Sequence, residues 1–279
     1  MSELHAVLTD EQWDELRATG VTRMRRAVAL RDVEAMTDRV WSLFERRGIR
    51  RGDRSTWPVG LGSKNQALRQ SGALNGFANE VTKALVDDLL GTGTWRETEA
   101  WGPALVTWPQ PGPWTLPHKV WHFDVPGRGD PDRPEAARLF GFLSSVAPRG
   151  GGTLVVEGSH ELVRRLVALT PDHDAGQSSD LRKALCRRHR WFAALMREST
   201  DGVRQFMVDG DEIDGVRVRV AELTGEPGDV SVMLPWTMHN FSMNCAPEPR
   251  LMVTHTVLRH DQRFYDAVPR SSKRGGPPA

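Results

Sequence analysis

The segment Trp121-His122-Phe123-Asp124 places an imidazole and a carboxylate two residues apart. In a β-strand such residues face the same side, with Cα atoms about 6.6 Å apart. Both side chains can therefore reach one metal ion. A second histidine, His239, follows a predicted strand at 230–234. Two histidines and one carboxylate form the facial triad of non-heme iron(II) oxygenases, which leaves coordination positions open for an oxo acid and for oxygen.

A histidine and an aspartate at this spacing occur often by chance, so the residues around His239 add specificity. They are Gly228, Asp229, Asn244, Pro249 and Arg250. Arg250 opens the next predicted strand, where its guanidinium can hold a carboxylate in bidentate fashion. Burial of the guanidinium without such an anion would be costly, so the alternative is that Arg250 is a surface residue of that strand.

Short apolar runs bounded by turn residues dominate the chain over 96–265. Strands are predicted at 103–108, 120–125, 139–146, 152–157, 216–220, 230–234 and 251–258. Many short strands separated by turns are typical of a sandwich or barrel, so we expect a mainly β core. A helical insertion at 159–200 interrupts the strands, and the polar residues 266–279 predict a disordered tail.

The first 95 residues have the apolar spacing of helices, and we expect a helical region that packs on the core. Thr9 and Gln12 predict a capping box at the start of a first helix, which should end near Gly20. A second helix is predicted at 31–47 and a third at 76–91. The buried face of the third would consist of Phe77, Val81 and Leu85.

The composition excludes several other classes of protein. Of the 279 residues, 39% are hydrophobic and 26% are charged, which suits a globular core. The net charge of +1 argues against nucleic-acid or membrane-surface binding, because both need a strongly basic field. No apolar run is long enough to span a bilayer. The two distant cysteines, Cys186 and Cys245, exclude a cysteine zinc site and favour reduced thiols, so we expect a soluble, cytoplasmic protein.

Four blocks of the sequence resemble the phytanoyl-CoA dioxygenase-like (PhyH) family of iron(II)/2-oxoglutarate-dependent oxygenases. They are LTDEQ at 8–12, WHFD at 121–124, GGTLVVEGSH at 151–160, and the set of Gly228, Asp229, His239, Asn244, Pro249 and Arg250. The resemblance implies a double-stranded β-helix with flanking helices, a jelly-roll barrel open at one end. It also implies that His122, Asp124 and His239 bind iron(II) and that Arg250 binds the distal carboxylate of 2-oxoglutarate.

The chain departs from the family pattern at two positions. Glu157 replaces the proline before the Gly-Ser-His turn, and Phe241 replaces a small residue two after the distal histidine. The family aromatic that can line the cosubstrate pocket would be Phe140. Halogenating relatives carry a small residue where this chain has Asp124, so the resemblance implies hydroxylation or a related oxidation.

Further candidates lie close to the metal motif. Lys119, together with Phe140 and Arg250, is a candidate for binding 2-oxoglutarate. The candidates for substrate contact are His118, Trp121, Trp108 and Arg128. Tryptophan mostly serves cores, and lysine and arginine are mostly surface charges, so each of these residues has a structural alternative.

The residues thus predict an iron(II)- and 2-oxoglutarate-dependent dioxygenase that uses O2 to hydroxylate a small molecule, such as a secondary metabolite, with release of succinate and CO2. No catalytic residue is predicted beyond the metal ligands. Two alternatives stay open: a non-catalytic jelly-roll binding protein, and a zinc-dependent hydrolase that uses the same ligands and a metal-bound water. The sequence indicates neither the substrate nor the oligomeric state.

Overall fold

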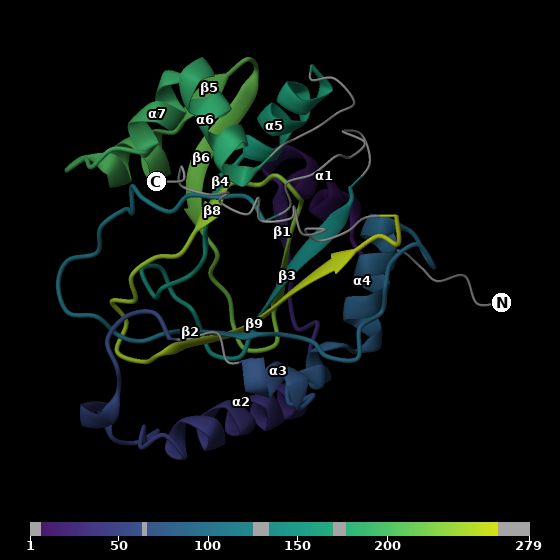
Figure 1. The fold of residues 1–279 in the computed structure, drawn as a ribbon, viewed down its shortest axis with the longest axis vertical. Helices are drawn as coiled ribbons and strands as arrows, with labels where there is room; N and C mark the ends of the chain where they lie inside the picture. The colour runs from purple at the N-terminus through teal and green to yellow at the C-terminus, as the bar shows by residue number, and fades with distance from the viewer. Residues whose placement is uncertain (1–6, 63–65, 125–133, 170–176, 262–279) are drawn as a thin grey trace, which may run out of the picture.

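The computed structural model describes residues 7–62, 66–124, 134–169 and 177–261. Its strands are β1 (Val21–Met24), β2 (Ala104–Thr107), β3 (Ala136–Phe142), β4 (Leu154–Glu157), β5 (Asp211–Ile213), β6 (Val216–Glu222), β7 (Val230–Met233), β8 (His239–Asn240) and β9 (Arg250–Leu258). They form two antiparallel sheets, in the orders β1-β7-β3-β9-β2 and β5-β6-β4-β8 (Figure 1). This architecture confirms the predicted mainly β class with a double-stranded β-helix core.

Apolar side chains of both sheets meet between them. β3 contributes Phe140 and Phe142, β9 contributes Met252 and β4 contributes Val155, each at most 1% exposed. Successive residues of a strand face opposite sides, so the alternation that turns Phe140 inward also turns Arg138 inward. The interior of the barrel therefore receives a charged side chain from the same strand that supplies part of its core.

The N-terminal helix α1 (Asp10–Thr19) begins with the predicted capping box. Thr9 Oγ1 accepts a hydrogen bond from the Gln12 amide at 3.2 Å, and the Gln12 side chain accepts one from the Thr9 amide at 3.0 Å. Gly20 then ends the helix in the left-handed region, at a φ of 83°.

The strand β1, which follows directly, contradicts the expectation of a purely helical region up to residue 95. It pairs with the edge of β7 over four residue pairs, from Val21 with Met233 to Met24 with Val230. Four residues are too few to display a strand period in the sequence. Their structure is decided by backbone pairing with a strand that lies some 200 residues away, so local patterns could not reveal it.

Three helices cover the outer face of the five-stranded sheet (Figure 1). They are α2 (Leu30–Glu45), α3 (Gln66–Gln70) and α4 (Glu80–Leu90). α2 confirms the second predicted helix to within a few residues at each end. Its apolar face packs in one cluster with outward-facing residues of the sheet such as Leu139 and Val253. The N-terminal region thus closes the barrel on this side.

The third predicted helix begins later than expected. A separate turn of 3-10 helix, Asn75–Phe77, comes first, and Asn79 then caps α4 by accepting a hydrogen bond from the Thr82 amide. This shift changes which residues face the core. Val81, expected to be buried, is 40% exposed, whereas Thr82 is fully buried.

The outer face of the four-stranded sheet is covered by α5 (Ser159–Ala168), α6 (Ser178–Arg188) and α7 (Arg190–Leu195). Figure 1 shows these helices at the opposite end of the molecule from α2 and α3. They confirm the predicted helical insertion in the part that the structure describes. A π-helical segment, Val203–Asp209, then leads into β5.

The strand predicted at 120–125 is not a regular strand in its described part, 120–124. Val120 has a φ of 67°, which breaks the extended chain, and His122 forms a single bridge with His239. The short strands β5 and β8 were not predicted. The expected disordered tail lies outside the described residues. Among the described helices, none combines the length and the apolarity that a membrane crossing requires.

Candidate metal centre

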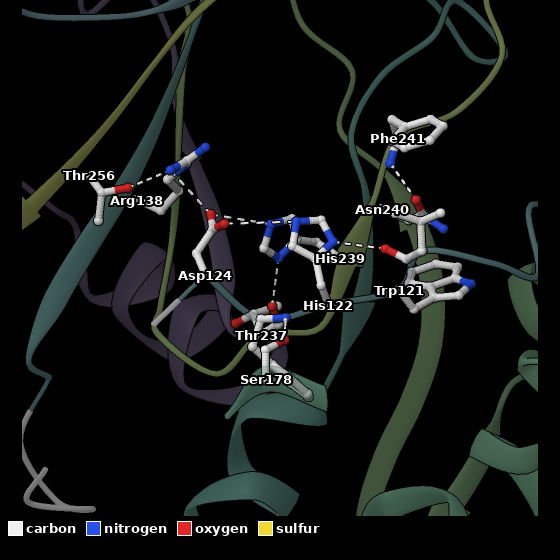
Figure 2. Close-up of polar contacts among 12 residues, drawn as sticks. Trp121, His122, Asp124, Arg138, Ser178, Thr237, His239, Asn240, Phe241 and Thr256 are labelled. Atoms are coloured by element: carbon white, nitrogen blue, oxygen red, sulfur yellow. Dashed lines mark hydrogen bonds and ion pairs between the residues drawn. The ribbon is translucent and has the colours of Figure 1, made fainter. Parts of the chain in front are cut away.

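Three side chains that the sequence singled out converge in the barrel (Figure 2). His239 Nε2 lies 3.3 Å from Asp124 Oδ2, and His122 Nε2 lies 3.8 Å from Asp124 Oδ1. The centroids of the two imidazole rings are 4.2 Å apart. One ligand atom from each residue fits within 4.8 Å of the others, which is close enough for a single metal ion.

Backbone pairing holds the two histidines in register. The His122 amide donates to the His239 carbonyl at 3.1 Å, and the His239 amide donates to the His122 carbonyl at 3.0 Å. His239 belongs to β8, which β4 anchors in the four-stranded sheet. A segment without regular strand structure is thereby fixed to the barrel at the residue that carries its imidazole.

Hydrogen bonds also orient the imidazole rings. His122 Nδ1 lies 2.9 Å from the Val120 carbonyl, and His239 Nδ1 lies 3.0 Å from the Thr237 carbonyl. A carbonyl can only accept, so Nδ1 holds the proton in each ring and Nε2 keeps a free lone pair. This is the usual way in which proteins orient histidine as a metal ligand.

The electrostatic surroundings keep His122 and Asp124 in their metal-binding forms. Burial and the neighbouring His239 lower the pKa of His122 to about 4. Burial raises the pKa of Asp124, but His239, Arg138 and His122 together outweigh burial and hold it well below its ordinary value. At neutral pH His122 is therefore neutral and Asp124 is ionised, the states in which these groups bind a metal.

The triad opens into a cavity of about 310 Å³ inside the barrel. The cavity brings the triad together with Arg250 and Phe140, two residues that the sequence also selected. Its lining consists of Leu61, Gly62, Leu105, Val106, His122, Asp124, Arg138, Phe140, Thr153, His239, Asn240, Phe241 and Arg250. A volume of this size suits one or two small organic molecules rather than a macromolecule.

Arg250 lies at the start of β9 and is only 4% exposed. Its Nη1 contacts Met252 Sδ at 3.4 Å, and its Nε is buried with no hydrogen-bond partner among the described residues. Burial lowers the pKa of Arg250 to about 10, an effect that Glu222 opposes. No carboxylate of the described residues forms a direct ion pair with this guanidinium. The cavity therefore contains a charged donor without an anion, as a carboxylate-binding site requires.

The other predicted site residues that the structure describes are absent from the lining of this cavity. Trp108 packs against Trp41, Phe44 and Trp57, and Trp121 is fully buried with its indole N–H bonded to the Pro117 carbonyl. Both tryptophans therefore follow the structural alternative.

His118 and Lys119 are likewise absent from the lining of the cavity. The side chain of Lys119 is exposed, and its carbonyl accepts a hydrogen bond from Asn240 Nδ2. His118 lies before Val120, whose φ of 67° breaks the extended chain that leads to His122. Arg128 lies outside the described residues.

Arg138, in contrast, lines the cavity and was missed. It lies on the inner face of β3, two residues before Phe140, and its Nη1 is 3.2 Å from Asp124 Oδ2. The predicted strand began at residue 139, so Arg138 was left in the preceding loop. A charged residue two positions before an inward-facing aromatic is the signal that could have identified it.

Solved structures of known proteins share the fold of this chain, although sequence comparisons find no match. No family model and no curated protein sequence match the chain. Its structure is similar to AviO1 from Streptomyces viridochromogenes Tue57, with a TM-score of 0.54 and 16% identity over 94% of this chain and 99% of that one. It is also similar to the non-heme α-ketoglutarate-dependent carbocyclase SnoK from nogalamycin biosynthesis, with a TM-score of 0.52 and 15% identity over 90% and 84%. HygX from Streptomyces hygroscopicus, with nickel and 2-oxoglutarate bound, matches with a TM-score of 0.51 and 13% identity over 92% and 89%.

At these identities the similarity establishes a shared fold. The chain has the double-stranded β-helix fold of 2-oxoglutarate-dependent non-heme enzymes. Within that fold it carries a candidate facial triad of the His-x-Asp…His type, formed by His122, Asp124 and His239.

Proposed function

We propose that the protein is an iron(II)- and 2-oxoglutarate-dependent dioxygenase that oxidises a small organic molecule and releases succinate and CO2. One observation carries the proposal: the candidate triad lines the same cavity as the buried Arg250, whose Nε has no hydrogen-bond partner among the described residues. A metal site alone would fit many enzymes. A metal site that shares a cavity with an unpaired buried guanidinium fits a dicarboxylic cosubstrate.

Each residue then has a defined role. His122, Asp124 and His239 would hold iron(II), and Arg250 would hold the distal carboxylate of 2-oxoglutarate. Iron(II) and 2-oxoglutarate, when bound there, would supply the activation of O2 that oxidation of a C–H bond requires. Phe140, Leu105 and Val106 give the cavity apolar walls that exclude water. Asp124 fills the coordination position that a halide would need, which favours hydroxylation or a related oxidation.

The compared structures support the cosubstrate. HygX has nickel and 2-oxoglutarate bound, and SnoK is α-ketoglutarate dependent. The alternatives of a zinc hydrolase or a binding module leave the buried Arg250 without a ligand. The small cavity suits a small-molecule substrate, and the two free cysteines agree with a reducing compartment such as the cytoplasm.

The test is an anaerobic titration of the protein with iron(II) and then 2-oxoglutarate. We expect the weak visible charge-transfer absorption that a 2-oxo acid gives when it chelates iron(II). His122→Ala should abolish this band, and Arg250→Ala should weaken it by raising the 2-oxoglutarate Kd. Arg39→Gln, on the exposed side of α2, is the matched control for loss of a positive charge. Wild-type protein that binds iron but gives no band would refute the proposal.

A further inference from the structure

Arg138 is a second guanidinium in the cavity that holds the candidate triad. It lies opposite Thr256 in the β3–β9 ladder, six residues along β9 from Arg250. The two arginines are therefore separated by about 20 Å of strand, at about 3.3 Å per residue. Arg138 approaches the triad from the Asp124 side, whereas Arg250 lies at the other end of the strand. Their backbone positions suit two different anions better than the two ends of one short dicarboxylate.

The contacts of Arg138 involve one side of its guanidinium. Nη1 donates to Thr256 Oγ1 at 2.5 Å and lies 3.2 Å from Asp124 Oδ2. Nε is buried and has no hydrogen-bond partner among the described residues. Figure 2 shows the second terminal nitrogen directed away from Asp124. Nε and Nη2 together form the edge of arginine that can bind a carboxylate through two parallel hydrogen bonds, and none of the described residues forms a hydrogen bond or ion pair with this edge.

The Phe140 ring and the barrel hold this guanidinium in place. The Arg138 Cζ lies 5.5 Å from the centroid of the Phe140 ring, and the hydrogen bond to Thr256 Oγ1 fixes Nη1. Burial lowers the pKa of Arg138, and Asp124 opposes this effect. The group is thus a preorganised cation, because its orientation is set before any ligand binds.

Charge balance indicates that this cation lacks a partner in the working enzyme. Asp124 is the carboxylate that approaches Arg138 among the described residues, and the proposed function assigns Asp124 to iron(II). An iron(II) ion and one carboxylate keep a net positive charge. The two carboxylates of 2-oxoglutarate offset that charge and the charge of Arg250. Arg138 then remains a largely buried cation beside a metal, a situation that favours one more anion.

The mouth of the cavity differs in chemistry from this charged region. Leu61 and Phe241 both line the cavity, yet they are 49% and 38% exposed. Large apolar side chains exposed at the rim of a pocket commonly contact the apolar part of a ligand. The cavity therefore offers an apolar contact at its mouth and a free guanidinium edge inside.

We propose that Arg138 binds a carboxylate of the primary substrate, and that this substrate is a small organic acid whose apolar body contacts Leu61 and Phe241. The inference rests on the proposed function, because it assigns Asp124 to iron and Arg250 to 2-oxoglutarate. It makes Arg138 the residue that selects acids over neutral molecules of the same shape.

The experiment compares acids with their neutral amides. Hexanoate, phenylacetate and hydrocinnamate, with the three corresponding primary amides, are titrated into anaerobic protein loaded with iron(II) and 2-oxoglutarate. Binding is measured by ligand-observed NMR. We expect at least one acid to bind about tenfold or more tightly than its amide, as a bidentate charged pair should give. Arg138→Gln should abolish that preference, Arg138→Lys should retain part of it, and Arg39→Gln should leave it unchanged.

The charge-transfer band, recorded on the same samples, separates the two hypotheses. A wild-type protein without the band would refute the proposed function whatever the acids do. If the band is present but no acid binds better than its amide, including the case in which neither series binds, the inference about Arg138 is wrong and the proposed function stands. If Arg138→Gln loses iron as completely as Asp124→Ala does, Arg138 positions the metal ligand, and its assignment to the substrate is also wrong.

Discussion

Replacing Arg250 with methionine should separate ligand binding from stability, because the two depend on this residue in opposite ways. In the folded protein the guanidinium is buried, and its Nε has no described partner. Glu222 is the carboxylate that raises the pKa of Arg250. Its oxygens already accept hydrogen bonds from the Gly152 amide, the Arg149 amide and the Ser242 hydroxyl. Methionine has a similar length and no desolvation cost. Replacing a buried charge by an apolar side chain of similar volume is often neutral or stabilises by about 1–4 kcal/mol.

The same substitution should greatly weaken 2-oxoglutarate binding. Removing one partner of a buried ion pair costs about 3–5 kcal/mol, because the other charge is left unpaired. At 1.4 kcal/mol per factor of ten, the 2-oxoglutarate Kd should rise by about two to three and a half orders of magnitude. The affinity for the metal alone should not change, because Arg250 does not contact the triad in the described structure.

The assay has two parts on the same preparations. Thermal denaturation of the metal-free protein reports stability, and anaerobic calorimetry with 2-oxoglutarate reports affinity for the cosubstrate. Arg250→Lys keeps the charge without the bidentate geometry, so its Kd should lie between those of the wild type and Arg250→Met. A metal-free Arg250→Met protein with a clearly lower Tm and an unchanged 2-oxoglutarate Kd would mean that Arg250 is structural, and the reasoning about its missing anion would be wrong.

Three further predictions concern stability. Burial raises the pKa of Glu135 to about 7 from 4.5, so the ionised form destabilises the fold as the pH rises through this interval. Glu135→Gln should therefore raise the Tm at about pH 8 and change it little at about pH 5, and an equal gain at both values would contradict this. Gly20→Ala should lower the free energy of unfolding, measured by urea denaturation, by about 1–3 kcal/mol. The reason is that Gly20 has a φ of 83° and that a Cβ there would lie 2.5 Å from His160 Nδ1. An unchanged denaturation midpoint would contradict this prediction. Trp108→Phe should lower the Tm, because it removes packing worth about 1–3 kcal/mol, and should leave the 2-oxoglutarate Kd unchanged. A higher Kd at wild-type stability would instead mean that Trp108 contacts the ligand.

The candidate metal site was predictable because its residues lie close to short, recognisable sequence patterns. His122 and Asp124 lie two residues apart, and both His239 and Arg250 border strands with clear apolar patterns. Capping of α1 by Thr9 and Gln12 is likewise a contact between near neighbours in the sequence. In each case a few neighbouring residues determine the local structure, so the motif can be recognised without knowledge of the rest of the chain.

Elements that depend on distant partners were not predictable in this way. β1 is a strand because β7 offers it a free edge, and β8 is a two-residue strand because β4 pairs with it. The expected strand around His122 failed for a related reason. Within its described part, 120–124, one bridge, to His239, supports it. Val120 also adopts a positive φ, which no composition rule predicts at a β-branched residue.

The cavity beside the candidate triad was the part of the site that was hardest to predict from the sequence, and the origin of its lining residues explains why. Leu61, Arg138 and Phe241 come from three separate segments and meet only when the two sheets close around the cavity. In the sequence none of the three is recognisable as a cavity residue. They read as a leucine in a loop, an arginine in a loop and an aromatic residue in place of a small one. The decisive feature is that Arg138 keeps a free guanidinium edge beside a carboxylate already assigned to metal. Such a feature is a balance of charges among distant residues, so it becomes visible only when their contacts are known.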